Sequence, residues 1–223
     1  MIEIVSATRG SRTNFWERTA LGASLKRLKH DTRLSSFIAF ENRRGLPDVY
    51  NDRITSEKSP DILVFMHDDV WIDDYCIADR ILDGLKTYDV IGVAGSRRCL
   101  PGQPVWSCID DRFTRENPAY LSGTVAHAKH PFGEVVHFGA SPADCELLDG
   151  VFLAARKPTL VTQGVCFDPQ FDFHFYDMDF CRSAREKGLR LGTWPICITH
   201  QSAGAFNSQG WREKRVVYGS KWP

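Results

Sequence analysis

His67, Asp68 and Asp69 form the group of side chains with the clearest chemical potential, because all three can ligate a metal ion. They directly follow segment 62–66, whose uninterrupted apolar residues are typical of a strand buried on both faces of a sheet. Ligands of open α/β sheets bind at the carboxyl ends of such strands. Adjacent carboxylates repel each other unless a cation or hydrogen-bond donors neutralise them. The pattern predicts a site for a divalent ion and a phosphate-bearing ligand, although ordinary capping carboxylates in a strand-end turn would look similar.

Asp177 and Asp179 form a second acidic pair, at the start of a helix predicted over 176–187. The positive end of a helix dipole stabilises carboxylates, so simple charge placement explains the pair equally well. The aromatic residues that precede the pair indicate an alternative. Desolvation by aromatic neighbours raises the basicity of a carboxylate, which suits a general base at the mouth of a pocket.

Two further sets of polar residues follow predicted strands. His200 ends a strand predicted over 192–199; such a histidine is usually structural, but with a distant aspartate cluster it becomes a candidate metal ligand. Thr8, Arg9 and Asn42 follow the first two predicted strands, where polar contacts can hold a nucleotide base and ribose. The sequence contains neither GxGxxG nor GxxxxGK[ST], so a dinucleotide fingerprint and a P-loop are both excluded.

The elements that must position these residues alternate between strand and helix, which predicts right-handed βαβ units and a mostly parallel central sheet flanked by helices. We expect strands at 2–7, 36–41, 61–66, 90–94, 151–155 and 189–199, and helices at 14–29, 49–55, about 77–85 and 176–187. Pro195 predicts that the last strand lies at an edge. Region 97–144 breaks the alternation and is rich in Gly, Pro, His and aromatic residues, so we expect an irregular hairpin and loop insertion there.

The composition fits one α/β domain over residues 1–205, followed by a tail at 206–223 that we expect to be helical and packed on the domain. The 28 basic and 28 acidic residues cancel, so no basic field indicates nucleic acid. The seven cysteines form no CxxC pair, which argues against a zinc knuckle and favours thiols in a reducing compartment. We see no signal-peptide pattern and expect a cytoplasmic protein.

The order and spacing of four motifs resemble the GT-A fold of nucleotide-sugar glycosyltransferases, and most closely the family 2 glycosyltransferases. The motifs are His-Asp-Asp-Val at 67–70, Leu-Asp-Gly-Val-Phe at 148–152, Phe-His-Phe-Tyr-Asp-Met-Asp at 173–179 and Thr-His at 199–200. A small bacterial subgroup of that family is similar in all four. The resemblance covers about residues 3–205.

The resemblance implies a metal site for Mn²⁺ or Mg²⁺ that holds the diphosphate of a sugar nucleotide. Asp69 matches the second aspartate of the family's Asp-x-Asp motif, and His200 resembles its third protein ligand. His67 stands where the family has the first aspartate, so this chain departs from the usual carboxylate. Asp68 is expected to take part of that role, by binding ribose or, through water, the ion.

The resemblance also implies roles in transfer. Asp177 matches the family's general base, which takes a proton from an acceptor hydroxyl in a single inverting step. Asp179 is expected to support the helix start or the acceptor. Asp149 and Gly150 are expected to border the sugar pocket. The region from Trp106 to Phe138, with several aromatic residues, is expected to shape the acceptor pocket, since aromatic faces suit sugar rings.

Together these inferences predict an inverting glycosyltransferase for a nucleotide-diphosphate sugar, with a UDP-sugar as first choice and Thr8, Arg9, Asn42 and Asp68 as nucleotide contacts. We expect a glycan or lipid-linked acceptor, as in bacterial surface polysaccharide or glycolipid synthesis. A lipid-linked acceptor would require peripheral membrane contact, which the basic and tryptophan residues at 211–222 would permit; a solvated terminal helix is the simpler alternative. Two other functions stay open: a non-catalytic sugar or nucleotide binding module, and a metal-dependent nucleotidyltransferase.

Overall fold

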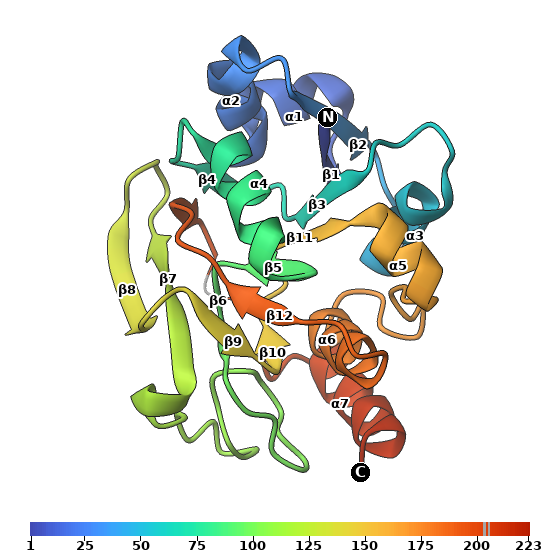
Figure 1. Ribbon diagram of the computed structural model, residues 1–223, viewed down its shortest axis with the longest axis vertical. Coiled ribbons are helices and arrows are strands. Elements are labelled where there is room, and N and C mark those ends of the chain that lie inside the picture. Colours follow the sequence, from blue (N-terminus) through green and yellow to red (C-terminus); the bar gives the residue numbers. More distant parts are fainter. Residues whose placement is uncertain (203, 205) are drawn as a thin grey trace.

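The computed structural model describes residues 1–202, 204 and 206–223, and its strands form two sheets with helices packed outside them (Figure 1). The order in the larger sheet is β2 (Leu34–Ala39), β1 (Ile2–Ala7), β3 (Ile62–Met66), β11 (Phe152–Arg156), β5 (Val90–Gly92), β12 (Leu191–Thr193) and β9 (Ala143–Cys145). β1 runs parallel to β2 and β3, and β12 runs parallel to β5. β11 lies antiparallel between β3 and β5. The fold is therefore mixed α/β, with a central sheet flanked by helices, as expected.

The smaller sheet has the order β10 (Leu147–Leu148), β6 (Ala94–Ser96), β7 (Leu121–His127), β13 (Ile198–His200) and β4 (Val70–Ile72), and β8 (Glu134–Gly139) pairs with β7. The expected hairpin in region 97–144 is the β7–β8 pair, which the short 3₁₀ helix η2 (Pro118–Tyr120) precedes.

Two expected strands are each divided between the sheets. The strand predicted over 90–94 turns at Val93 and becomes β5 and β6. The strand predicted over 189–199 becomes β12 and β13, which are separated around Pro195. The edge position inferred from that proline is wrong, because β12 lies between β5 and β9, and β13 lies between β7 and β4. Proline cannot donate to a ladder, and here it marks the crossing from one sheet to the other.

The helices are α1 (Arg12–Arg18), α2 (Ala20–Arg27), α3 (Leu46–Thr55), α4 (Ile77–Thr87), α5 (Lys157–Gln163), α6 (Tyr176–Glu186) and α7 (Gln209–Lys221), with the 3₁₀ turn η1 (Leu28–His30) after α2. The single helix predicted from Asn14 is two helices. Ser11 is the first N-cap, and its Oγ accepts from the Asn14 N–H at 3.3 Å. Thr19 is extended and caps α2 by accepting from the Gly22 N–H at 3.0 Å, so its side chain competes with helix continuation.

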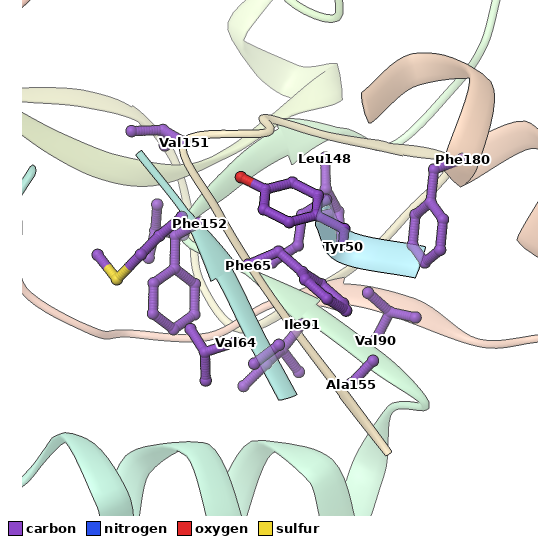
Figure 2. Packing of buried hydrophobic residues seen from close by; sticks show 14 of the residues in the cluster. Tyr50, Val64, Phe65, Val90, Ile91, Leu148, Val151, Phe152, Ala155 and Phe180 are labelled. Carbon is purple, nitrogen blue, oxygen red and sulfur yellow. The ribbon is translucent and has the colours of Figure 1, made fainter. Parts of the chain in front are cut away.

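The buried core fixes α6 against the larger sheet. The Tyr50 ring of α3 packs on Phe65 of β3 with 4.9 Å between ring centroids, and Figure 2 shows these two side chains beside Phe180 of α6. Phe167 stacks on Phe180 at 4.2 Å, and all four side chains are fully buried. Burial of each such ring stabilises the fold by about 1.5–3 kcal/mol. The first turn of α6 is therefore held near the strand ends of the larger sheet, where the polar candidate site residues lie.

The C-terminal segment is helical, and its largest side chains are buried against the rest of the chain. Trp211, Tyr218 and Trp222 are each less than 10% exposed. Lys214 and Lys221 form ion pairs with aspartates outside α7. The tryptophan and lysine side chains that would permit membrane contact are thus engaged within the fold. None of the helices that the structure describes is long and apolar enough to cross a membrane.

Candidate functional site

A cavity of about 440 Å³ opens where the strand ends of both sheets meet the first turn of α6. Ala7 ends β1, His67 directly follows β3, and the register between β7 and β13 pairs His127 with His200 at their last residues. Eight residues expected to form a site line this cavity: His67, Asp68, Asp69, Trp106, Asp149, Gly150, Asp177 and His200. Segments far apart in the sequence therefore converge on this cavity.

His67, Asp69 and His200 converge on a point where one ion could be held. One ligand atom from each lies within 4.8 Å of the others, and His200 Nε2 is 3.3 Å from Asp69 Oδ1. The backbone supports this approach, because the Gln201 N–H donates to the Asp69 carbonyl at 3.0 Å. Two imidazoles and one carboxylate form a donor set that suits divalent first-row transition ions. Asp68 is not part of this group of three.

The electrostatics of Asp69 and His67 favour their metal-binding forms. Burial opposes ionisation of Asp69, but the hydrogen bond from His200 outweighs it and lowers the pKa of Asp69 to about 2. Burial also lowers the pKa of His67, which keeps its imidazole neutral. A carboxylate and a neutral imidazole are the states that ligate a metal. The residues present therefore fit a divalent cation.

Asp177 occupies the first turn of α6 and faces the same cavity. Its Oδ2 accepts from the Gly150 N–H at 2.9 Å and its Oδ1 from the Met178 N–H at 2.9 Å. Burial and the charge of Asp149 raise the pKa of Asp177 to about 6, although the backbone hydrogen bonds oppose that rise. A carboxylate with this pKa is ionised at neutral pH and accepts a proton more readily than an ordinary aspartate.

Asp149 and Gly150 lie directly beside Asp177. Asp149 is fixed by two donors, Trp106 Nε1 at 2.8 Å and the Val151 N–H at 2.9 Å. A Cβ on Gly150 would lie 2.7 Å from Tyr176 Cζ and 2.8 Å from Asp177 Cβ, closer than carbon atoms pack. Only glycine allows the first turn of α6 to approach so closely.

The residues expected to contact a nucleotide line a second, adjoining cavity of about 480 Å³. Thr8, Arg9 and Asn42 are joined there by Arg43 and Arg44, which the sequence did not single out. The Asn42 N–H donates to the Thr8 carbonyl at 2.9 Å, so the loops after β1 and β2 are held together. The two cavities share four lining residues, Ala7, Leu46, Asp68 and Phe173. A ligand can therefore extend from the basic cavity toward the metal triad.

Asp179 does not line either cavity. Its carboxylate is buried and accepts from Trp222 Nε1 at 2.7 Å, while Lys221 Nζ lies 2.8 Å away. The expected acceptor contact therefore does not fit the position of Asp179, which instead anchors α7 to α6. Its other expected role, support of α6, agrees with these contacts.

Several lining residues were not recognised from the sequence as part of the site. His127 comes from β7, in the region where the sequence pattern is irregular, and Trp211 comes from α7. Tyr176 is inside the motif at 173–179 but had no role assigned. A residue pair in register, such as His127 and His200, is visible only once the strand pairing is known.

The mixed α/β fold that positions this site is the GT-A fold of glycosyltransferases, which several solved structures share. GalNAc-T7, solved with UDP, GalNAc and Mn²⁺, is similar with a TM-score of 0.54 and 11% identity, covering 99% of this chain and 47% of that one. The mannosyltransferase PcManGT from Pyrobaculum calidifontis, in complex with GDP-Man and Mn²⁺, has a TM-score of 0.50 and 12% identity, covering 98% of this chain and 62% of that one. The A197 protein from STIV has a TM-score of 0.50 and 11% identity, covering 93% and 97%.

The family model of the glycosyltransferase-like family matches residues 24–217, and the chain belongs to that family. A comparison with curated proteins finds no match. The chain spans less than two thirds of GalNAc-T7 and of PcManGT, and at these identities the likeness shows the fold alone.

Proposed function

We propose that the protein is an inverting glycosyltransferase, which moves a sugar from a nucleotide-diphosphate sugar to an acceptor hydroxyl. The observation that carries this proposal is the meeting of two groups in one cavity: the triad of His67, Asp69 and His200, and the carboxylate of Asp177 with its raised pKa. The first group suits a leaving diphosphate with its cation, and the second suits removal of a proton from the attacking oxygen.

The donor would occupy both cavities. Thr8, Arg9 and Asn42, together with Arg43 and Arg44, offer charged and polar contacts to the nucleotide in the basic cavity. Asp68, which lines both cavities, is placed for a ribose hydroxyl at their junction. A UDP-sugar is the first choice of donor. The two similar solved structures that contain nucleotides hold UDP and GDP-Man, so both uridine and guanosine diphosphate sugars should be tested as donors.

The metal triad would bind Mn²⁺ or Mg²⁺, and Mn²⁺ is the ion in both of those solved complexes. When bound, the ion supplies a positive charge that stabilises the diphosphate as it leaves. The chain's own contribution is to hold one carboxylate and two imidazoles in place, with Asp69 kept ionised by the hydrogen bond from His200.

Asp177 would take the proton from the acceptor hydroxyl as that oxygen attacks the anomeric carbon. The Gly150 and Met178 N–H groups hold the carboxylate in one orientation, so it meets the substrate without rearranging. Asp149, fixed by Trp106, borders the same space and is placed to contact sugar hydroxyls. One base and one attacking oxygen, opposite the leaving group, give inversion in a single step.

The acceptor would enter at the aromatic part of the cavity. Phe138, Phe173, Phe206 and Trp211 line that part together with Trp106, and aromatic faces pack well on sugar rings. A glycan, free or linked to a lipid, matches such a surface, and synthesis of bacterial surface polysaccharide or glycolipid would use one.

The test is incubation of purified protein with Mn²⁺ or Mg²⁺ and a panel of UDP-, GDP- and dTDP-sugars, followed by detection of the free nucleoside diphosphate. We expect release from at least one donor and loss of that release in Asp177→Asn. Lack of both binding and hydrolysis for every donor would reject the proposal. Binding without turnover would favour the non-catalytic module, and release of pyrophosphate would favour a nucleotidyltransferase.

A further inference from the structure

We propose that Tyr176 is a positioning residue whose hydroxyl fixes the ring of His67 so that Nδ1 is the atom presented to the metal ion. The proposal rests on the metal site of the proposed function and adds a residue that lies behind that site. It also explains how a histidine can stand where the family has an aspartate.

The hydrogen bonds of Tyr176 determine which nitrogen of His67 carries the proton. The Tyr176 hydroxyl donates to the Gly150 carbonyl at 2.8 Å, and a phenol has only one hydrogen to give. Its second contact, with His67 Nε2 at 2.9 Å, must therefore be one in which the phenol oxygen accepts. Nε2 then carries the hydrogen, and Nδ1 keeps the free lone pair. Metal-bound histidines are commonly oriented by such a bond from the second ring nitrogen.

The surrounding packing holds Tyr176 in one place. Its side chain is 3% exposed, and its ring packs between Tyr50 and Phe167 with 6.0 Å between centroids in each case. The preceding residue, Phe175, has a φ of 66°, a left-handed conformation that non-glycine residues rarely adopt. Phe175 is held there by stacking on Tyr218 of α7 at 5.0 Å. The phenol thus cannot swing away from His67 without breaking this packing.

Tyr176 and Asp177, the first two residues of α6, both form hydrogen bonds with the backbone of Gly150. Tyr176 donates to the Gly150 carbonyl, and Asp177 accepts from the Gly150 N–H. A single peptide segment therefore links the orientation of a metal ligand to the position of the proposed base. An aspartate at position 67 would present two equivalent oxygens to the ion and would need no hydrogen-bond partner to select one. A histidine has two unlike nitrogens, and only the one without the hydrogen can bind the ion.

The closing experiment measures Mn²⁺ affinity of the full-length protein without any sugar nucleotide, by isothermal titration calorimetry. Four proteins form a double-mutant cycle: wild type, Tyr176→Phe, His67→Asp and the double variant. Loss of an outer-shell partner typically weakens metal binding by about 10–100-fold, so we expect that loss for Tyr176→Phe when His67 is present. In the His67→Asp background we expect a change below about twofold, because the phenol then has no imidazole to orient.

A matched control is Tyr88→Phe, which removes the phenol oxygen of another largely buried tyrosine, outside both cavities, and should leave Mn²⁺ affinity unchanged. Equal losses from Tyr176→Phe in both backgrounds would overturn the proposal, because they would show a general structural role. Unchanged affinity in the single variant would overturn it as well. A wild type that does not bind Mn²⁺ would instead reject the metal site of the proposed function.

A second measurement does not depend on folding of the variants. The ¹⁵N chemical shifts of the His67 ring in metal-free wild-type protein distinguish the two tautomers. We expect the hydrogen on Nε2. A hydrogen on Nδ1 would overturn the proposal even if Tyr176→Phe lowered Mn²⁺ affinity.

Discussion

Replacing Asp177 with asparagine should slow transfer strongly while stabilising the protein at neutral pH. The carboxyl has a pKa of about 6 in the folded protein, against an ordinary value of 3.8, because burial and Asp149 disfavour its charge. One pKa unit equals 1.36 kcal/mol, so the ionised group destabilises the folded state by about 3 kcal/mol above pH 6. Asparagine carries no charge, but it satisfies only one of the two N–H donors, which costs about 1 kcal/mol. The expected net gain is about 2 kcal/mol.

The pH dependence of the stability difference between wild type and Asp177→Asn shows whether the charge of Asp177 causes it. Below pH 3.8 the carboxyl is neutral in both folded and unfolded chains, so its burial carries no charge penalty. Between pH 3.8 and about 6 the unfolded chain ionises first, and the wild type loses stability relative to Asp177→Asn. Above pH 6 the difference is constant. Urea unfolding of both proteins at several pH values between 4 and 8, with EDTA present, measures this difference.

Asp168→Asn is the matched control, because its charge has the opposite effect. Burial opposes ionisation of Asp168, but hydrogen bonds from Lys221 and Gln170 outweigh it and lower its pKa. The ionised Asp168 carboxylate stabilises the folded protein, and this stabilisation is fully present above pH 3.8. Asp168→Asn should therefore destabilise the protein by an amount that does not change between pH 5 and 8. A stability difference for Asp177→Asn that is independent of pH, or that favours the wild type more strongly at pH 8 than at pH 4, would refute the reasoning. Transfer by Asp177→Asn should fall by about 10²–10⁴-fold at pH 7 and above, and by less below pH 6, where the wild-type carboxyl is itself protonated.

Three further predictions concern the metal and the sugar pocket. Mn²⁺ at 100 times its dissociation constant should stabilise the wild type by about 2.7 kcal/mol, a rise of about 5–10 °C in Tm by differential scanning fluorimetry, and should leave the Tm of His200→Ala nearly unchanged. His67→Asp replaces an imidazole with an oxygen ligand and should increase the affinity for Mg²⁺ relative to Mn²⁺, measured by competitive titration; an unchanged ratio would contradict the assigned donor set. Trp106→Phe removes the donor to Asp149 at 2.8 Å and should lower kcat/KM by about 5–10-fold, worth about 1 kcal/mol, while Mn²⁺ affinity stays at the wild-type value.

The sequence predicted those elements around the candidate site whose patterns are local. The apolar run before His67 and the helix that starts at Tyr176 are properties of short segments, and both are confirmed. The antiparallel pairing of β11 could not be predicted in the same way, because a fully buried apolar strand has the same pattern in either direction. The role of Asp179 could have been predicted better. Residues two positions apart on a helix point to different faces, so Asp177 and Asp179 cannot both face one cavity.

The position of β11 has a consequence for how the protein folds. β3 and β5 do not pair with each other, and the strand that joins them follows β3 by about 90 residues, which makes this contact slow to form. His67 lies at the end of β3, and Gly150 lies just before β11, so the two sides of the site stay apart until β11 inserts. We therefore expect an early folding intermediate to contain the paired β1, β2 and β3 but no Mn²⁺ affinity. His200 reaches His67 and Asp69 only when β13 pairs with β4, so recovery of Mn²⁺ binding during refolding would report that pairing in the smaller sheet.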